Sequence, residues 1–215
     1  MTIRERFDLT INYFLINNPV AETELIYRDP FELIVAVILS AQCTDKRVNI
    51  ITPPLLEKYP DAVSMADAEP EDIFGYIRSC TYPNNKAKHL SGMSKMLVKE
   101  FGGIVPSDPE LLQRLPGVGR KTANVVASVI FKKPVMAVDT HVFRVSKRIG
   151  LVINAKTPLQ AELQLSKNIP SGLIPDAHHW FILHGRYVCK ARNPLCNDCG
   201  LKIFCKYYLN RGKME

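Results

Sequence analysis

The sequence predicts an all-α protein, and two observations carry this prediction. Apolar residues recur at helical spacing almost throughout, and the only strand candidate, residues 135–138, is too short to build a sheet. Proline and glycine pairs divide the 215 residues into short segments, about ten helices in all, with no internal repeat. We therefore expect one or two helical domains in this 24.3 kDa chain.

Several helices can be placed from their apolar pattern. Residues 31–39 are apolar around the whole helix, which predicts a fully buried central helix, because a surface helix keeps one polar face. One-sided apolar stripes predict half-buried helices further along, at Ile73 and Ile77 and at Leu90, Met93, Leu97 and Val98.

Helix starts and breaks follow from local signals. Ser107-Asp-Pro-Glu110 and Thr157-Pro-Leu-Gln160 both have the capping-box pattern with proline in the first turn. Breaks are expected at 53–54, 60–61, 83–85, 102–103, 116–117 and 171–172.

Composition points to a soluble globular protein. Hydrophobic residues make up 47% and charged residues 23%, which excludes a disordered or collagen-like chain. The most apolar stretch, Leu33 to Leu39, is far shorter than the about 20 residues that a membrane helix needs. The first residues lack the layout of a signal peptide, so we expect a cytoplasmic protein.

The net charge of +7 is concentrated in two blocks. Residues 113–148 hold eight basic residues and one acidic residue, and residues 186–215 hold seven and two, whereas residues 1–112 are net acidic. If the two blocks share a face, they form a positive surface that would attract a phosphate backbone. The alternative is that these basic residues only solvate the protein surface and bind no phosphate.

Residues 115–119 read Leu-Pro-Gly-Val-Gly and stand between helices predicted over 108–114 and 119–131. Pro116 ends the first helix, and the two glycines can adopt positive φ and let another backbone approach. The first amides of the second helix then form a phosphate site, although a plain helix turn has the same pattern. The cations that follow favour the phosphate site: Arg120, Lys121, Lys132 and Lys133.

Two residues of this basic block are candidates for chemistry. Lys121 lies in the first turn of the second helix, where the helix dipole disfavours an ammonium, and a neutral lysine can form a Schiff base with a sugar aldehyde carbon. Asp139 is the only acid of the block. Because aspartate is also a favoured N-cap residue, Asp139 can be a helix cap, a catalytic acid or both.

Four of the six cysteines crowd near the C-terminus, and their number and spacing predict a metal centre. They are Cys189, Cys196, Cys199 and Cys205. Zinc and an iron-sulfur cluster both suit four thiolates, but the spacing contains only one Cys-x2-Cys pair, which favours the cluster. The loop between the first two would carry Lys190 and Arg192 as a second phosphate-facing surface. Cys43 and Cys80 are expected to be buried small hydrophobes.

Together these motifs resemble the endonuclease III family of bifunctional DNA glycosylases, in the helix-hairpin-helix superfamily. The resemblance rests on residues 39–45, 115–126, 138–145 and 178–186 and on the cysteine spacing. It implies two all-helical domains with a DNA-binding cleft between them. A helix-hairpin-helix domain would span 22–134, and a discontinuous domain of 1–21 and 135–215 would hold a [4Fe-4S] cluster.

The resemblance also implies roles for individual residues. Lys121 matches the lysine that attacks C1′ of a flipped nucleotide, Asp139 matches the acid that stabilises positive charge on the sugar, and Gln42 matches the residue that fills the gap in the base stack. The four cysteines match the cluster ligands. The other expected DNA contacts are Leu115, Gly117, Val118, Gly119, Arg120, Lys190 and Arg192.

Two differences within the family refine this expectation. Adenine-excising relatives have a small residue in place of Lys121 and a glutamate in the helix at 35–39, whereas this chain has the lysine and no such glutamate, which favours the lyase-competent branch. Residues 80–86 carry Tyr82-Pro83 where the family has Leu-Tyr. This loop contacts the opposite strand in the family, so the opposite-base preference is left open.

The leading hypothesis is a base excision repair DNA N-glycosylase with apurinic/apyrimidinic lyase activity, acting on oxidized pyrimidines in double-stranded DNA. We expect a monomer without membrane contact, associated with the nucleoid if the source is bacterial. Two alternatives remain, a non-enzymatic DNA-binding module with a structural metal and a monofunctional glycosylase that lacks the lyase step.

Overall fold

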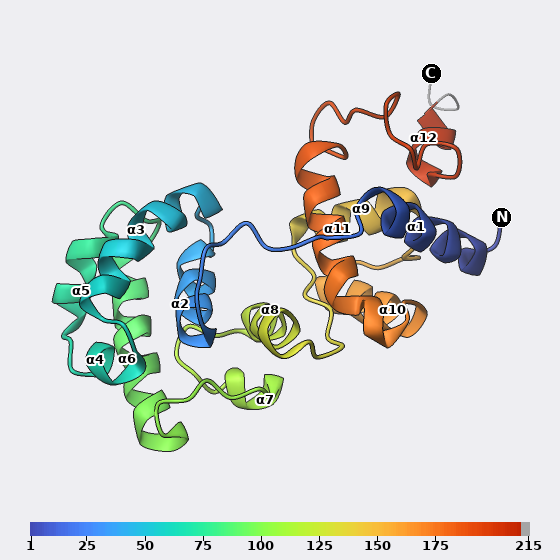
Figure 1. The fold of residues 1–215 in the computed structure, drawn as a ribbon. Helices are drawn as coiled ribbons and strands as arrows, with labels where there is room; N and C mark the ends of the chain where they lie inside the picture. Colours follow the sequence, from blue (N-terminus) through green and yellow to red (C-terminus); the bar gives the residue numbers. More distant parts are fainter. Residues whose placement is uncertain (212–215) are drawn as a thin grey trace. The chain divides into compact units, whose positions relative to one another are not determined.

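The computed structural model describes residues 1–211, and the prediction of an all-α fold is confirmed. Within these residues the chain forms twelve α-helices and one 3-10 helix, with no strand (Figure 1). The first six helices are α1 (Ile3–Asn17), α2 (Pro30–Ser40), α3 (Asp45–Lys58), α4 (Ala62–Ala66), α5 (Pro70–Ile77) and α6 (Pro83–Phe101). The others are α7 (Pro109–Leu112), α8 (Arg120–Phe131), α9 (Thr140–Ile149), α10 (Pro158–Asn168), η1 (Ser171–Leu173), α11 (Ile174–Tyr187) and α12 (Lys206–Arg211).

The chain divides into two compact units. One unit is continuous, Thr23–Phe131, and the other combines Met1–Glu22 with Lys132–Glu215. No helix within residues 1–211 is long and apolar enough to span a membrane.

The continuous unit is built around α2. Every residue from Phe31 to Leu39 is buried, so the predicted central helix is confirmed. The helix packs against α3, α6 and α8, while α4 and α5 pack on α6. Asp29 caps it by accepting from the Glu32 amide at 2.8 Å. Each fully buried leucine or isoleucine of such a helix contributes about 1.5–3 kcal/mol to folding.

The expected break at Pro53 and Pro54 is wrong, because both prolines lie inside α3. Proline removes a backbone donor and normally ends a helix. Here the helix continues because its apolar side is held by the core, with Val48 and Leu55 completely buried. The Thr52 hydroxyl also donates to the Val48 carbonyl at 3.0 Å, one turn back. Tertiary burial has overridden the local signal.

Two of the expected helix starts can be compared with the observed caps. The capping box at Thr157 is confirmed, since its hydroxyl accepts from the Gln160 amide and the Gln160 side chain accepts from the Thr157 amide. The cap at Ser107 is wrong, because Asp108 occupies that role and accepts from the Glu110 amide at 2.7 Å. Aspartate and serine are about equally good N-caps, so the sequence did not distinguish adjacent candidates.

The discontinuous unit joins the two ends of the chain through aromatic packing. Phe14 of α1 stacks on Trp180 of α11 with ring centroids 5.6 Å apart, and Trp180 Nε1 donates to the Asn18 carbonyl at 2.8 Å. In the same unit α9 packs against α10, α11 and α12. Residues 135–138, the strand candidate, form no strand, although Met136 and Ala137 are completely buried.

A buried histidine of α11 predicts acid sensitivity. His179 is only 8% exposed, and burial together with the charges of His178, Lys132 and Arg186 lowers its pKa to about 3. Its unfolded pKa is about 6.5, so the unfolded chain takes up the proton first as the pH falls. Stability should therefore be full above about pH 6.5 and decrease as the pH falls toward 3.

Thermal unfolding between pH 7 and pH 4.5 tests this expectation. The His179→Gln variant should show a smaller loss of melting temperature over this range than the wild type. The matched control is His89→Gln, which changes an exposed histidine and should keep the wild-type slope. Identical slopes for all three proteins would contradict the assignment.

Candidate active site and metal centre

The glycine turn lies between α7 and α8 and is anchored on α6. The amide of Val118 donates to the Leu115 carbonyl at 3.0 Å and closes the turn. Gly117 has a φ of +80°, and a Cβ added there would lie 2.8 Å from the Cβ of His89. The expectation of positive φ is thus confirmed for Gly117 and wrong for Gly119, which does not adopt it.

We therefore expect alanine to lower the stability of the protein at position 117 but not at position 119. Gly117→Ala places a side chain in a left-handed conformation and against His89, so it should destabilise the protein by about 1–3 kcal/mol. The control is Gly119→Ala, because no atom lies within 4 Å of its added Cβ. Urea unfolding of both variants is the measurement, and equal stability losses would contradict this description of the turn.

The residues predicted to contact DNA at this turn differ in exposure. Leu115 and Val118 are buried, at 2% and 5% exposed, so their side chains belong to the core and only their backbone can face a ligand. Gly117, Gly119 and Arg120 are exposed. The first amides of a helix have no carbonyl to bind within the helix, and they therefore favour anions. The exposed backbone at the start of α8 thus suits a phosphate.

Lys121 is exposed in the first turn of α8, directly after the glycine turn. The following residues, beginning with Ala123, are buried and fix the helix against the core of the unit. The helix that carries the lysine is therefore packed into the core, while the lysine side chain is accessible to a ligand.

Asp139 caps α9, which confirms one of its two possible roles. Its Oδ1 atom accepts from the amides of His141 and Val142, both at 2.8 Å. Its Oδ2 atom lies 3.2 Å from Nδ1 of His141. The carboxylate is thus held by its own helix with its side chain 15% exposed. Lys121 belongs to the continuous unit, whereas Asp139 belongs to the discontinuous unit.

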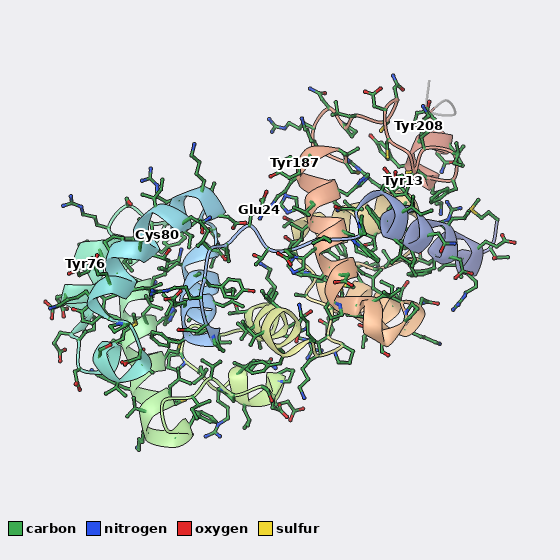
Figure 2. The ribbon with its side chains drawn as sticks, viewed as in Figure 1. Tyr13, Glu24, Tyr76, Cys80, Tyr187 and Tyr208 are labelled. Atoms are coloured by element: carbon green, nitrogen blue, oxygen red, sulfur yellow. The ribbon has the colours of Figure 1, made fainter. Side chains whose placement is uncertain are left out.

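Gln42 lies between α2 and α3, exposed and with a φ of +54°. Left-handed backbone is uncommon outside glycine and, where it occurs, often marks a functional position. The Gln42 carbonyl accepts from the Thr81 hydroxyl at 2.8 Å, so this position is tied to the loop before α6. Figure 2 labels Cys80, the residue that precedes Thr81.

The four C-terminal cysteines line one cavity of the discontinuous unit. The cavity is partly open to solvent, and Tyr208, which Figure 2 labels, is another lining residue. Among residues 1–211, no three His, Cys, Asp or Glu side chains are gathered as around a single metal ion. Four cysteine thiols that line one cavity are a donor set suited to an iron-sulfur cluster or to a zinc ion.

Two arginines of α9 hold the loop that begins at Cys189. Arg148 donates to Sγ of Cys189 at 3.5 Å and to the Lys190 carbonyl at 2.6 Å. Arg144 donates to the Cys189 carbonyl at 3.0 Å. Lys190 and Arg192 are both exposed on this loop, and their contact with phosphate stays a prediction.

The four cysteine thiols of the cavity favour a bound cation. Burial raises the pKa of the Cys199 and Cys205 thiols, and the charges of the other cysteines raise it further. Four adjacent thiolates are therefore unfavourable alone, whereas bound iron would deprotonate and neutralise them. The donor set and its surroundings thus fit an iron-sulfur cluster.

Sequence reasoning missed several residues that shape these sites. They are His141, which contacts Asp139, and Arg148, which contacts Cys189. A histidine two residues after an N-cap aspartate is a local signal that could have been used. Arg148 gave no such signal, because its partners lie more than 40 residues away in sequence.

The comparisons with known proteins agree with these features. Residues 35–171 match the model of the HhH-GPD superfamily base excision DNA repair proteins. Endonuclease III of Rickettsia prowazekii (strain Madrid E) is 48% identical over 197 residues, which cover 92% of each chain. Endonuclease III of Bacillus subtilis (strain 168) is 46% identical over 195 residues, 91% of this chain and 89% of that one.

The fold is also similar to solved structures. A trapped covalent intermediate of endonuclease III with DNA, an estranged-adenine complex, superposes with a TM-score of 0.93. The two chains are 41% identical, and the match covers 100% of both. The chain belongs to the HhH-GPD superfamily of base excision DNA repair proteins and, within it, to the endonuclease III family. It is therefore an enzyme, a DNA glycosylase with apurinic/apyrimidinic lyase activity.

Proposed function

We propose that this protein excises oxidized pyrimidine bases from double-stranded DNA and then cleaves the strand 3′ to the abasic site, with Lys121 as the nucleophile. The observation that carries the proposal is the exposed Lys121 on the first turn of α8, directly after a phosphate-suited glycine turn. The similarity to a trapped covalent endonuclease III–DNA intermediate supports it, because a covalent intermediate requires a nucleophile on the enzyme and a lysine amine is one such group.

The proposed chemistry begins when the damaged nucleotide leaves the duplex, since C1′ is otherwise shielded. The neutral Lys121 amine attacks C1′, the bond from C1′ to the base breaks, and the base leaves with the bonding electrons and takes up a proton. The sugar ring opens to a Schiff base on the lysine. Loss of a C2′ proton then expels the 3′ phosphate, and water hydrolyses the Schiff base to regenerate the amine.

Asp139 is proposed to act on the charge that develops during this reaction. A carboxylate near the sugar stabilises the positive charge that builds up as the base departs. Because Oδ1 is engaged by the backbone of α9, the carboxylate is preorganised and needs little reorientation during the reaction.

Double-stranded DNA is the proposed partner, bound mainly through its phosphates. The exposed backbone of Gly117, Gly119 and Arg120 would hold one phosphate, and Lys190 and Arg192 would contact others. Contacts of this kind make binding fall as the salt concentration rises. We further propose that the enzyme acts as a monomer in the cytoplasm.

We propose that Cys189, Cys196, Cys199 and Cys205 bind a [4Fe-4S] cluster. When bound, such a cluster would join residues 189–205 into one rigid segment and so fix the loop that carries Lys190 and Arg192.

Iron analysis should find about four irons per chain, and the protein should show broad visible absorbance. Cys205→Ser should lose most of this iron, whereas Cys43→Ser should keep it. A colourless protein with one zinc would overturn this assignment.

Borohydride trapping tests the proposed function against its alternatives. Incubation with duplex DNA that contains thymine glycol or an abasic site should give a covalent protein-DNA adduct after reduction, together with strand cleavage. A non-enzymatic DNA-binding module would bind without nicking. A monofunctional glycosylase would release the base without an adduct. Either of these two results would overturn the lyase mechanism.

A further inference from the structure

A buried lysine stands at the end of the central helix of the continuous unit. Lys86, on the first turn of α6, is only 4% exposed. Its ammonium donates to the carbonyl oxygens of Leu39 at 2.8 Å and Ala41 at 2.7 Å and to Sγ of Cys80 at 3.1 Å. An ammonium has three N–H donors, so all three are used within the protein. Lys86 is therefore not available to a DNA phosphate.

The Lys86 ammonium takes the place of a glycine cap at the end of α2. The last carbonyls of a helix lack amide partners and carry the negative end of its dipole. The Ser40 carbonyl accepts from the Cys43 amide at 3.0 Å, whereas those of Leu39 and Ala41 accept from Lys86. Because a buried ammonium is costly without such partners, these contacts favour one conformation of the chain that leaves α2.

Two exposed residues with left-handed backbone adjoin this anchor. Gln42, with a φ of +54°, directly follows Ala41. Tyr82, also with a φ of +54° and 62% exposed, precedes α6, and its carbonyl accepts from the Lys86 amide at 3.2 Å. The Thr81 hydroxyl links the two loops through the Gln42 carbonyl. Strained positions persist only where the surrounding contacts determine them, and Lys86 and Thr81 supply such contacts.

We infer that Lys86 is a positioning residue that holds Gln42 and Tyr82 together as one rigid edge, which enters the base stack when a damaged nucleotide is extruded. The inference rests on the proposed function. Side chains that occupy an opened stack must resist its closing, and a loop that is already ordered loses less entropy in doing so. Lys86 would thus act on base extrusion without touching DNA or the reacting sugar.

Two substitutions of different severity test this role in the full-length protein. Lys86→Met removes the charge and all three donors at similar volume. Thr81→Val removes only the exposed bond to Gln42 and should fold normally. The matched control is Ser91→Ala, which removes a buried hydrogen bond of α6, to the Ala68 carbonyl at 3.2 Å. Each protein is assayed on duplex DNA with thymine glycol and on single-stranded DNA with a preformed abasic site.

Thr81→Val should slow single-turnover excision from the duplex by about fivefold, the effect of one net hydrogen bond, and Lys86→Met by about tenfold or more. Cleavage of the single-stranded abasic site, which needs no opening of a stack, should stay within about twofold for both. The fluorescence of a 2-aminopurine opposite the lesion should rise less on binding of either variant than on binding of the wild type. Ser91→Ala should match the wild type in all three measurements.

Equal slowing on both substrates, or excision and fluorescence at wild-type values in both variants, would overturn the role of Lys86. If Lys86→Met does not fold, Lys86→Gln, which lacks the charge but keeps an amide donor, takes its place in the same assays with the same contradicting outcomes. Failure of the proposed function would be seen separately, because the wild type itself would then give neither excision nor a trapped adduct.

Discussion

Replacing Lys121 with alanine is expected to abolish borohydride trapping and to lower cleavage of abasic duplex DNA by about a thousandfold or more, because the nucleophile of the covalent step is lost. DNA binding should persist, since the glycine turn that precedes α8 binds through its backbone. The measurement is the yield of the reduced adduct on a denaturing gel, together with the single-turnover cleavage rate.

Lys95→Ala is the matched control, because Lys95 is an exposed lysine of the same unit on α6. It should trap and cleave as the wild type does. Equal trapping by the Lys121→Ala variant and the wild type would show that another amine forms the Schiff base, and the assignment of Lys121 would then be wrong.

Asp139→Asn is expected to slow base excision by about a hundredfold with little change in folding stability. Asparagine is as good an N-cap as aspartate, so the bonds to the His141 and Val142 amides can be kept while the negative charge is lost. The lost charge no longer stabilises the developing positive charge on the sugar. Single-turnover release of thymine glycol and urea unfolding are the two measurements.

Asp139→Ala provides the comparison that separates the two roles of this carboxylate. It should lose the same catalytic effect and, in addition, about 1 kcal/mol of folding stability, because alanine cannot cap α9. If Asp139→Asn excised the base at the wild-type rate, Asp139 would be a structural cap alone.

The local features of this protein could be predicted from short stretches of sequence. The central helix at 31–39 and the cap at Thr157 depend on contacts between residues a few positions apart, which a pattern of neighbours contains. Lys121 and the cysteine group stood out for the same reason, as an unusual residue type at a recognisable spacing. Their roles came from the resemblance to a family, because spacing alone allowed a plain turn or a zinc site.

Other features depended on contacts that no local pattern contains. Pro53 remains inside a helix because the core on one side of α3 outweighs the loss of a donor. The sequence does not distinguish Lys86 from the exposed lysines, because its partner Leu39 lies 47 residues away. The position of α1 beside Trp180 joins residues 162 apart.

By itself the sequence determined that the chain is helical, where some helices begin, such as the one capped by Thr157, and which lysine and cysteines are candidates for chemistry. These depend on backbone preferences and hydrogen bonds within one or two turns, which consecutive residues encode. Only the tertiary structure decided that Lys86 is buried rather than exposed and that Arg148 contacts Cys189. Burial and pairing of this kind arise when distant segments pack together, so their energies appear only in the folded chain.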